Sequence, residues 1–470
     1  MMRKIILFEL NEVPWRVVKY YCDKNPDSTF AKILPQCFKY ETVTPDQGHL
    51  SPWITWPTLH RGVDNTKHGI GDLNQDLEQV NQDYPPIWQI LQKNGIKTGV
   101  FGSMHSSPVP SDFRKYVFYV PDAFAVDKTA HPEYIEPFQD FNLSMSRESA
   151  RNVSGGINMK TGSQMLMKVP QLGFKMNTFF DLGKQLLDER KRPWVRTRRR
   201  TYQVVLAFDV FMKQMRKSKP QFVTFFSNHV ASSMHRYWAA TFPGDYKQFD
   251  IGKDWVDTYK NEIDFTMNKF DKFFSEMVAF ANENPDYKIV VASSMGQAST
   301  VAELLDSQLL MGNEAKFFEF LKMDASQWKH VPSMFPQYNV TIIPEKVEYF
   351  ANQLKRISIA GRPLEFRQME NGFFAVDLGQ KNLKEKVIQF DGTNYSFEET
   401  GFENMEIDDH SGSTAYHIPE GTLVIYDPQD KSIKKEITQI PSTALVPSIV
   451  KNFDIPMPAY LKYQPIAGIN

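Results

Sequence analysis

The sequence has little cysteine and no long hydrophobic run. Cys22 and Cys37 are its two cysteines in 470 residues, too few for a disulfide framework, which predicts a reducing compartment. No apolar run approaches the ~20 residues that a membrane span requires. The first apolar segment starts at Lys4, with no charged-then-apolar leader and no cleavage site before it. These absences predict a cytoplasmic protein without a membrane span.

The chain also has no large excess of positive or negative charge. The formal net charge is −1, so the whole-chain balance gives no reason to expect a nucleic-acid partner. Hydrophobic residues make up 41% and charged residues 23% of the chain, as in ordinary globular proteins. No internal repeat or low-complexity tract interrupts it. The length allows one large α/β domain with insertions, or two domains.

Apolar strand-like segments alternate with helical ones near the start of the chain, which is typical of a parallel sheet. We therefore predict an α/β fold with a mostly parallel central sheet flanked by helices and a smaller α+β subdomain. A strand at Gly421–Pro428 should return to the main sheet. The predicted parts are a first part of the core at 1–125, an insertion at 126–200, a second part of the core at 201–300, the α+β subdomain at 301–400, and the last part of the core with a C-terminal tail at 401–470.

The segment from Ser51 to His60 carries the most specific signal. Thr55 stands two places before Pro57, where a helix N-cap lies when proline occupies the first turn. A hydroxyl there faces free backbone N–H groups and the positive end of the helix dipole, a place that binds anions. Attack by Thr55 on phosphorus or sulfur is then chemically reasonable. The simpler alternative is that Thr55 only caps the helix.

Several motifs follow one another in a familiar order. Thr55-Trp-Pro-Thr-Leu-His60 followed by His68-Gly-Ile70 resembles the nucleophile segment of the alkaline phosphatase superfamily, in its type I phosphodiesterase/nucleotide pyrophosphatase branch. Lys4–Leu10 is similar to the first strand of that branch, and Asp408–Gly412 is similar to its last histidine loop. Phe222–Asn228 and Lys288–Ser294 are similar to its two later metal-bearing strands. The resemblance implies an alkaline phosphatase-like core and a cap formed by 126–200. It also implies phosphoryl or phosphodiester transfer from a small phospho- or sulfo-ester, with Thr55 as nucleophile.

The ligands of the superfamily's two metal sites are only partly kept. The residues that match one site are Asn11, Thr55, Ser294 and Met295. An amide, hydroxyls and a thioether do not suit a hard divalent ion, so we predict that this site is degenerate. The residues that match the other site are Asn228, His235 and His410, with His229 as a rival to Asn228. We therefore expect at most one divalent metal, zinc or manganese, or none.

Two acidic residues flank Asn11. If strand alternation continues past Leu10, Glu9 points the same way as Asn11 and Glu12 points away. Glu9 is therefore the carboxylate that alternation would bring to the site. His60, His68, His105 and His417 are read as structural, because a lone histidine needs partners before it forms a site.

A basic run covers Arg190–Arg200. It is either a solvated helix face or a clamp in which Arg198 and Arg199 bind an anionic substrate. The favoured function is a phosphoryl- or phosphodiester-transfer enzyme with Thr55, His235 and His410 as its catalytic residues. The alternatives are a metal-free transferase using Thr55 and a histidine, and a catalytically dead anion-binding protein on the same fold.

Overall fold

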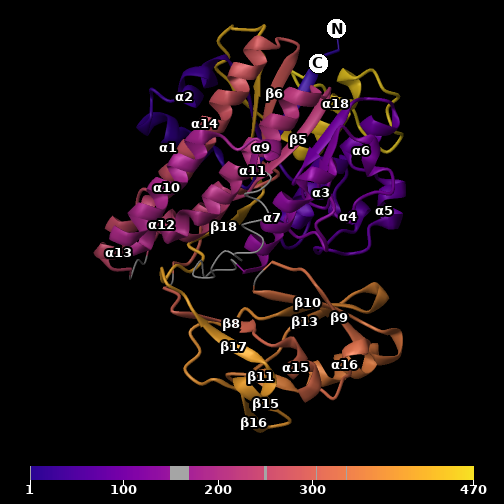
Figure 1. The fold of residues 1–470 in the computed structure, drawn as a ribbon, viewed down its shortest axis with the longest axis vertical. Helices are drawn as coiled ribbons and strands as arrows, with labels where there is room; N and C mark the ends of the chain where they lie inside the picture. Colours follow the sequence, from indigo (N-terminus) through magenta and orange to yellow (C-terminus); the bar gives the residue numbers. More distant parts are fainter. Residues whose placement is uncertain (1, 149–168, 248–250, 303, 335, 470) are drawn as a thin grey trace.

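A mixed sheet forms the centre of the larger of two lobes in the computed structural model (Figure 1). The structure describes residues 2–148, 169–247, 251–302, 304–334 and 336–469. All neighbouring strands of this sheet run parallel except β19, which runs antiparallel to β6 and β2. The strands, in spatial order, are β20 (Ile437–Pro441), β2 (Phe38–Val43), β19 (Glu420–Tyr426), β6 (Tyr287–Ala292), β1 (Lys4–Leu10), β5 (Phe222–Ser227), β3 (Thr98–Phe101) and β4 (Phe118–Val120). The predicted fold class is confirmed.

Strand β1 is buried on both faces because helices cover the sheet from both sides. Ile6 and Phe8 enter one hydrophobic core, whereas Ile5 and Leu7 enter the other. This twofold alternation within a continuous apolar run is typical of a central parallel strand. Because β5 and β6 flank β1, the carboxyl ends of the three strands lie side by side.

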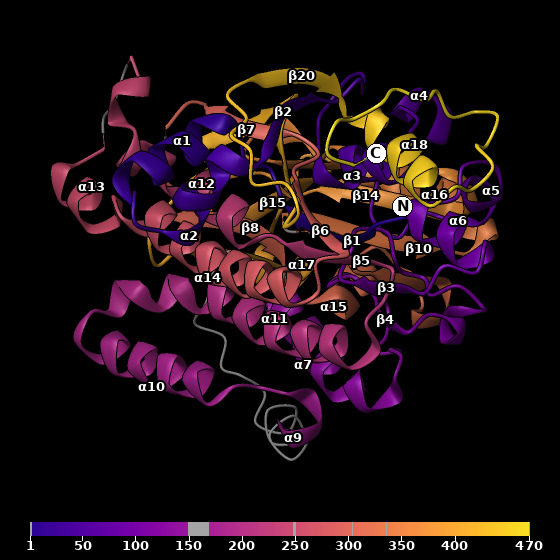
Figure 2. The same ribbon diagram turned by 90° about the horizontal axis from the view of Figure 1, so that it is seen from above.

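The helices form a layer on each face of the sheet (Figure 2). Those that contribute to the first core are α1 (Trp15–Lys24), α2 (Thr29–Ile33), α7 (Glu136–Glu148), α9 (Val169–Leu172), α11 (Arg199–Ser218), α12 (His229–Thr241) and α14 (Glu262–Glu283). Those that contribute to the second are α3 (Pro52–Arg61), α6 (Ile87–Lys93) and α18 (Leu445–Asn452). The short helices α4 (Asn65–His68), α5 (Glu78–Asp83) and α13 (Lys253–Tyr259) and the longer α10 (Met176–Lys191) lie around these layers.

The smaller lobe lies below the carboxyl ends of the central strands in Figure 1. The chain enters it after β7 (Gly296–Ser299) and returns through β18 (Ala415–Ile418), and these two strands pair antiparallel. Its core is separate from those of the large lobe. Its strands are β8 (Ser307–Met311), β9 (Trp328–Val331), β10 (Gln337–Ile342), β11 (Ile357–Ile359), β12 (Arg362–Pro363), β13 (Phe366–Gln368), β14 (Phe373–Asp377), β15 (Val387–Phe390), β16 (Thr393–Ser396) and β17 (Phe402–Glu406), and its helices are α15 (Glu314–Phe320), α16 (Val347–Leu354) and α17 (Phe397–Thr400).

Side chains of the small lobe hold a loop of the large one. Arg367 forms an ion pair with Asp72, and Gln337 Nε2 donates to Asp72 Oδ1 at 2.8 Å. Asn74 Nδ2 donates to the carbonyl of Pro332 at 2.8 Å. These contacts attach the small lobe at a second place besides the paired strands β7 and β18.

The insertion predicted at 126–200 includes residues 149–168, which lie outside the described residues. Its described parts form α7, α9 and α10, and α10 lies outside α11 (Figure 2). The predicted domain boundaries stay predictions. Across the described parts of the chain, no helix has both the length and the hydrophobicity to cross a membrane.

Candidate metal centre and active site

The residues that follow strand β1 form a hydrogen-bonded unit at the carboxyl edge of the sheet. Asn11 Nδ2 donates to Glu12 Oε1 at 2.8 Å and to Asn228 Oδ1 at 2.7 Å. Trp56 Nε1 donates to Asn11 Oδ1 at 2.7 Å. Both ends of the Asn11 side chain are therefore used, and Asn11 orients the Glu12 carboxylate.

Glu12 corrects the prediction from strand alternation. Its φ is 60°, a left-handed conformation that ends the extended chain and turns the side chain toward Asn11 instead of away. Glu9 keeps the alternation but points into the second core, where His60 Nε2 lies 2.8 Å from its Oε1. The carboxylate of this site is therefore Glu12.

Two histidines converge on Glu12. His235 Nε2 lies 2.9 Å and His417 Nε2 lies 3.4 Å from Glu12 Oε2. The Nδ1 atoms of His235 and His417 lie 2.8 Å and 2.7 Å from the carbonyls of Ala415 and Leu50, respectively. A carbonyl only accepts, so each Nδ1 carries a proton, and in a neutral ring each Nε2 then presents a lone pair. Two imidazole lone pairs and a carboxylate thus face one point.

The electrostatics of this cluster favour a positive charge between its members. Burial by itself would raise the pKa of Glu12, but His417 and His235 hold that pKa well below its usual value. Burial by itself would lower the pKa of His417, but Glu12 raises it. Without a cation, the lone pairs of neutral imidazoles would repel the carboxylate, so the arrangement requires a proton or a metal ion.

The donor set fits zinc. Three ligand atoms, one each from Glu12, His235 and His417, lie within 4.8 Å of one another, and two imidazoles with one carboxylate are a common set in catalytic zinc sites. Magnesium prefers oxygen ligands and fits less well. Each histidine has its Nδ1–H on a backbone carbonyl, as metal-bound histidines generally do. The His235 side chain is 25% exposed, so a substrate or water can reach this side of the cluster.

His417, and not His410, accompanies His235. The side chain of His410 is 58% exposed, and its Nδ1 lies 2.9 Å from Asp306 Oδ1. In the same loop Asp409 turns inward and accepts a hydrogen bond from Tyr237, while His410 points out. His417 lies on β18, opposite Gln297 of β7, whose side-chain amide donates to Glu12. This strand pairing has no local sequence signal, so the sequence could not separate the two histidines.

The other two residues predicted as ligands, Asn228 and His229, form hydrogen bonds within the protein. Asn228 Oδ1 accepts the Asn11 amide, so its side chain is part of the hydrogen-bonded unit. His229, its rival, is buried, with Nδ1 against Ser227 Oγ and Nε2 3.1 Å from the carbonyl of Thr266. Burial lowers the pKa of His229 to about 3, as expected of a neutral structural histidine.

Thr55 is not the helix cap that the sequence predicted. Helix α3 begins at Pro52 with Ser51 as its N-cap, and Pro57 lies inside it. Proline there leaves the carbonyl of Trp53 without its helical donor, and His105 Nε2 donates to that carbonyl at 2.8 Å instead. The helix thus tolerates an internal proline, and Thr55 lies beyond the free N–H groups of the first turn.

Two hydroxyl groups hydrogen-bond to each other in the predicted degenerate metal site. Thr55 Oγ1 and Ser294 Oγ are 2.8 Å apart, and Thr55, Ser294 and Met295 are each 0% exposed. Asn11 joins the same edge through Trp56, the neighbour of Thr55. A hydroxyl pair and a thioether offer no charged ligand for a hard ion. This part of the site is therefore closely packed, and Thr55, Ser294 and Met295 present no carboxylate or imidazole.

Arg198 and Arg199 already have anionic partners. Arg198 donates to both carboxylate oxygens of Glu262, at 2.8 and 2.6 Å. Arg199 donates likewise to Glu189, at 2.6 Å from its NH2 group. Both carboxylates are buried, so removing either cation would leave an uncompensated charge. These pairs make the predicted clamp unsuitable, because neither guanidinium is free for a substrate.

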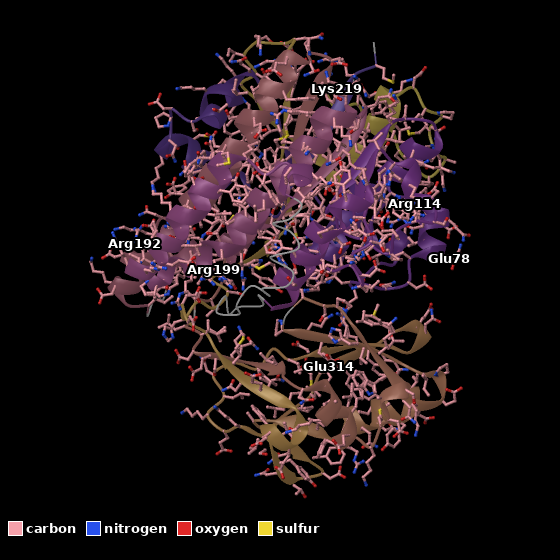
Figure 3. The ribbon with its side chains drawn as sticks, in the orientation of Figure 1. Glu78, Arg114, Arg192, Arg199, Lys219 and Glu314 are labelled. Carbon is pink, nitrogen blue, oxygen red and sulfur yellow. The ribbon has the colours of Figure 1, made fainter. Side chains whose placement is uncertain are left out.

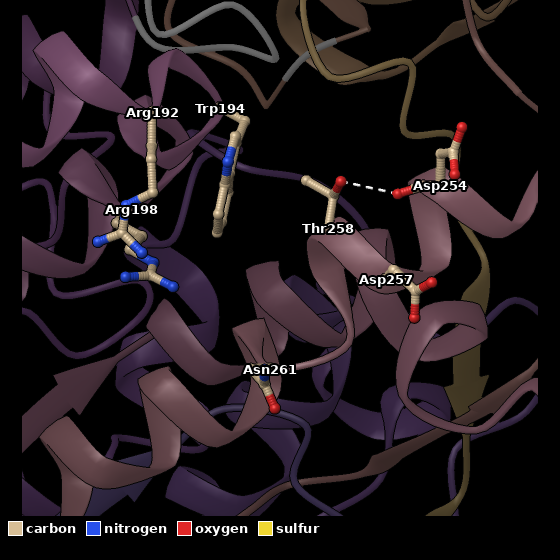
Figure 4. A pocket seen from close by; sticks show the side chains of 7 residues that line it. All are labelled: Arg192, Trp194, Arg198, Asp254, Asp257, Thr258 and Asn261. Atoms are coloured by element: carbon tan, nitrogen blue, oxygen red, sulfur yellow. Dashed lines mark hydrogen bonds between the residues drawn. The ribbon is translucent and has the colours of Figure 1, made fainter.

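Arg198 lines a cavity of 480 Å³ on the large lobe (Figure 4). Arg192 and Arg198 lie to one side of the Trp194 ring, and Asp254 and Asp257 lie to the other. The acidic side of this cavity makes it a poor anion site. Figure 3 shows Arg192 and Arg199 on the same large lobe and Glu314 on the small one.

No protein-family model and no curated protein matches the chain. Solved structures similar to it include murine ectonucleotide pyrophosphatase/phosphodiesterase 5, with 11% identity, a TM-score of 0.41 and coverage of 99% of this chain and 98% of that one. A TAB5 alkaline phosphatase mutant has 12% identity, a TM-score of 0.37 and coverage of 97% and 100%. Phosphonoacetate hydrolase from Sinorhizobium meliloti 1021, in complex with phosphonoformate, has 10% identity, a TM-score of 0.41 and coverage of 96% and 95%.

All three belong to the alkaline phosphatase superfamily, which is the resemblance predicted from the sequence. Identities of 12% or less with TM-scores of 0.41 or less carry nothing about activity.

Proposed function

We propose that this chain is a phosphoryl- or phosphodiester-transfer hydrolase with a single divalent cation, zinc by preference, held by Glu12, His235 and His417. The observation that carries the proposal is the convergence of the Nε2 atoms of two histidines on Glu12 Oε2, with the Nδ1 atom of each ring held by a backbone carbonyl. The ordered sequence resemblance supports the substrate class. A small phosphate ester or diester is the substrate, and a sulfate ester is the alternative anion.

A bound zinc ion would supply Lewis acidity toward a phosphoryl oxygen. Residues of the chain hold and orient the groups that would bind this ion. Asn11 and Gln297 fix the Glu12 carboxylate by donating to its two oxygens. The carbonyls of Ala415 and Leu50 fix the tautomer and direction of the two imidazole rings. The site is therefore arranged before substrate arrives, which lowers the reorganisation needed during reaction.

Two oxygen nucleophiles are available to such a site. Water reaches the site beside the exposed edge of His235. The water oxygen forms the new bond to phosphorus, the ester P–O bond breaks, and one proton of the water goes to the leaving oxygen. Thr55 is the nucleophile implied by the sequence resemblance, and it lies at the same edge of the sheet. Its side chain is 0% exposed and bonded to Ser294. Water is therefore the nucleophile that fits this arrangement better.

The test compares metal content with turnover in one set of variants. Freshly purified protein and its H417A and H410A variants are subjected to elemental analysis and assayed with bis(p-nitrophenyl) phosphate, before and after chelation. We expect one zinc per chain and turnover in the unaltered protein and in H410A, and neither in H417A. T55A should retain turnover if water attacks and lose it if Thr55 does.

Other outcomes would overturn the proposal. Turnover that survives chelation would favour the metal-free transferase. Zinc bound without turnover of phosphate or sulfate esters would favour an anion-binding protein. Loss of zinc in H410A would contradict the assigned ligands.

A further inference from the structure

Helix α10 (Met176–Lys191) presents a hydrophobic stripe to solvent. Met176 is 67%, Phe180 70% and Leu187 61% exposed, and the neighbouring Leu186 is 55% exposed. Positions 176, 180 and 187 follow the spacing of one helix face, and Gly183 completes it without a side chain. Four large exposed hydrophobic residues on one helix form a patch rather than scattered exceptions.

The opposite face of α10 buries polar groups. Thr178 Oγ1 donates to Asp209 at 2.6 Å, Gln185 Nε2 donates to the carbonyl of Val195 at 2.8 Å, and Glu189 pairs with Arg199. Phe179 and Leu182 also pack against the first core, although only partly buried. An ordinary surface helix turns its most apolar stripe inward, whereas α10 turns much of its apolar surface outward.

The exposed charges beside the stripe are all positive. Lys184, Arg190 and Lys191 are exposed, and no acidic side chain of the described residues pairs with them. The acidic residues of α10 are already engaged: Asp181 with Lys269 and Lys272, Asp188 with Arg192, and Glu189 with Arg199. The outer face therefore combines apolar side chains with uncompensated positive charge.

We propose that this outer face of α10 binds the surface of an anionic lipid bilayer. An amphipathic helix with Phe and Leu on one face and basic residues beside them lies in the headgroup region of a membrane. Anionic lipids attract each basic residue near the surface. Because α10 lies at the outer margin of the molecule (Figure 2), a plane can approach it.

A second copy of the chain is a less suitable occupant. Parallel pairing of two α10 helices along the stripe would bring Lys184, Arg190 and Lys191 of each copy toward the same basic residues of the other. Like charges at such close range are destabilising. Charge complementarity therefore selects an anionic surface.

The proposal is tested by cosedimentation of the full chain with vesicles. Vesicles of about one third phosphatidylserine in phosphatidylcholine are compared with pure phosphatidylcholine, at low and high salt. We expect binding to the anionic vesicles that weakens with salt. F180S/L187S should lower the partition coefficient at least about tenfold, and K184Q and K191Q about fivefold each.

A matched variant controls for loss of hydrophobicity. V301S/I433S removes two side chains that are 73% and 62% exposed elsewhere and should leave binding unchanged. All these positions are exposed, so thermal unfolding should confirm that each variant folds. Equal losses in the two double variants, equal binding to both vesicle types, or no binding at all would overturn the proposal. A dimer that F180S/L187S dissociates, without vesicle binding, would assign the stripe to a second copy instead.

Discussion

Replacing His417 by alanine should abolish stabilisation by zinc, whereas replacing His410 should not. The two histidines are seven positions apart in the sequence. His417 Nε2 faces Glu12 and its side chain is 8% exposed, while His410 pairs with Asp306 on the surface. H410A thus removes the same chemical group from a place that we assign no role in metal binding.

The size of the effect follows from binding linkage. Zinc at 100 times its dissociation constant stabilises the folded state by about 2.7 kcal/mol. A chain of 470 residues has an unfolding entropy of about 1 kcal/mol/K, at about 2.1 cal/mol/K per residue. The melting temperature should therefore rise by about 3 °C. If loss of one ligand weakens binding about 100-fold, about 0.4 kcal/mol remains, and the shift falls below about 1 °C.

Differential scanning calorimetry of metal-stripped protein, with and without added zinc, measures these shifts. The unaltered protein and H410A should move together, and H417A should stay near its metal-free melting temperature. Equal loss of the shift in H410A and H417A would refute the ligand assignment. Absence of any zinc shift in the unaltered protein would refute the metal site itself.

Three further predictions concern residues other than the proposed metal ligands. Burial raises the pKa of Asp122 to about 6, above the ~3.9 of an unfolded chain, so its stabilising contribution is present at low pH and lost as pH rises through 6. Relative to D122N, the free energy of unfolding in urea should rise by about 2 kcal/mol from pH 7 to pH 4. The same pH dependence of unfolding in both proteins would contradict this. R199A should lower the free energy of unfolding in urea by about 2 kcal/mol, because it leaves Glu189 buried without this cation. The KM for an anionic ester should stay unchanged. A raised KM would instead support Arg199 as part of an anion-binding site. G296A places a Cβ 2.1 Å from the carbonyl oxygen of Glu420, so β7 and β19 must shift; we expect a loss of about 2 kcal/mol by the same method, and an unchanged midpoint would contradict the close approach.

The sequence predicted the sheet better than the site. The apolar run Lys4–Leu10 and the strand near Gly421–Pro428 depend on local pattern, and both form strands of the main sheet. That β19 runs antiparallel between β6 and β2 depends on the path of the chain through the small lobe, which no local pattern records.

The site depended on features that periodicity does not encode. His235 was placed in the site by the sequence resemblance, and it lies in the cluster with Glu12 and His417. Glu12 was missed because a single left-handed residue ended the strand alternation. His417 was missed because its position depends on the pairing of β18 with β7 across an inserted lobe. Thr55 was wrongly predicted to cap the helix, because α3 starts earlier than Pro57 suggested. His105 provides the hydrogen bond to the carbonyl of Trp53 that the internal proline cannot provide.

The position of β1 between β5 and β6 also governs how the protein is made. Its flanking strand β6 ends at Ala292, roughly 280 residues after β1 leaves the ribosome, which at about 5–20 residues per second is a delay of roughly 15–60 s. Throughout that interval the apolar nascent segment Ile5–Phe8 lacks at least one of its two neighbours, and it lacks both until β5 has been made. It is therefore exposed to chaperones or aggregation. His417 emerges later still, so a truncated product that stops before it has Glu12 and His235 of the proposed site but not His417. Metal loading of the proposed site would then report that translation has passed β18.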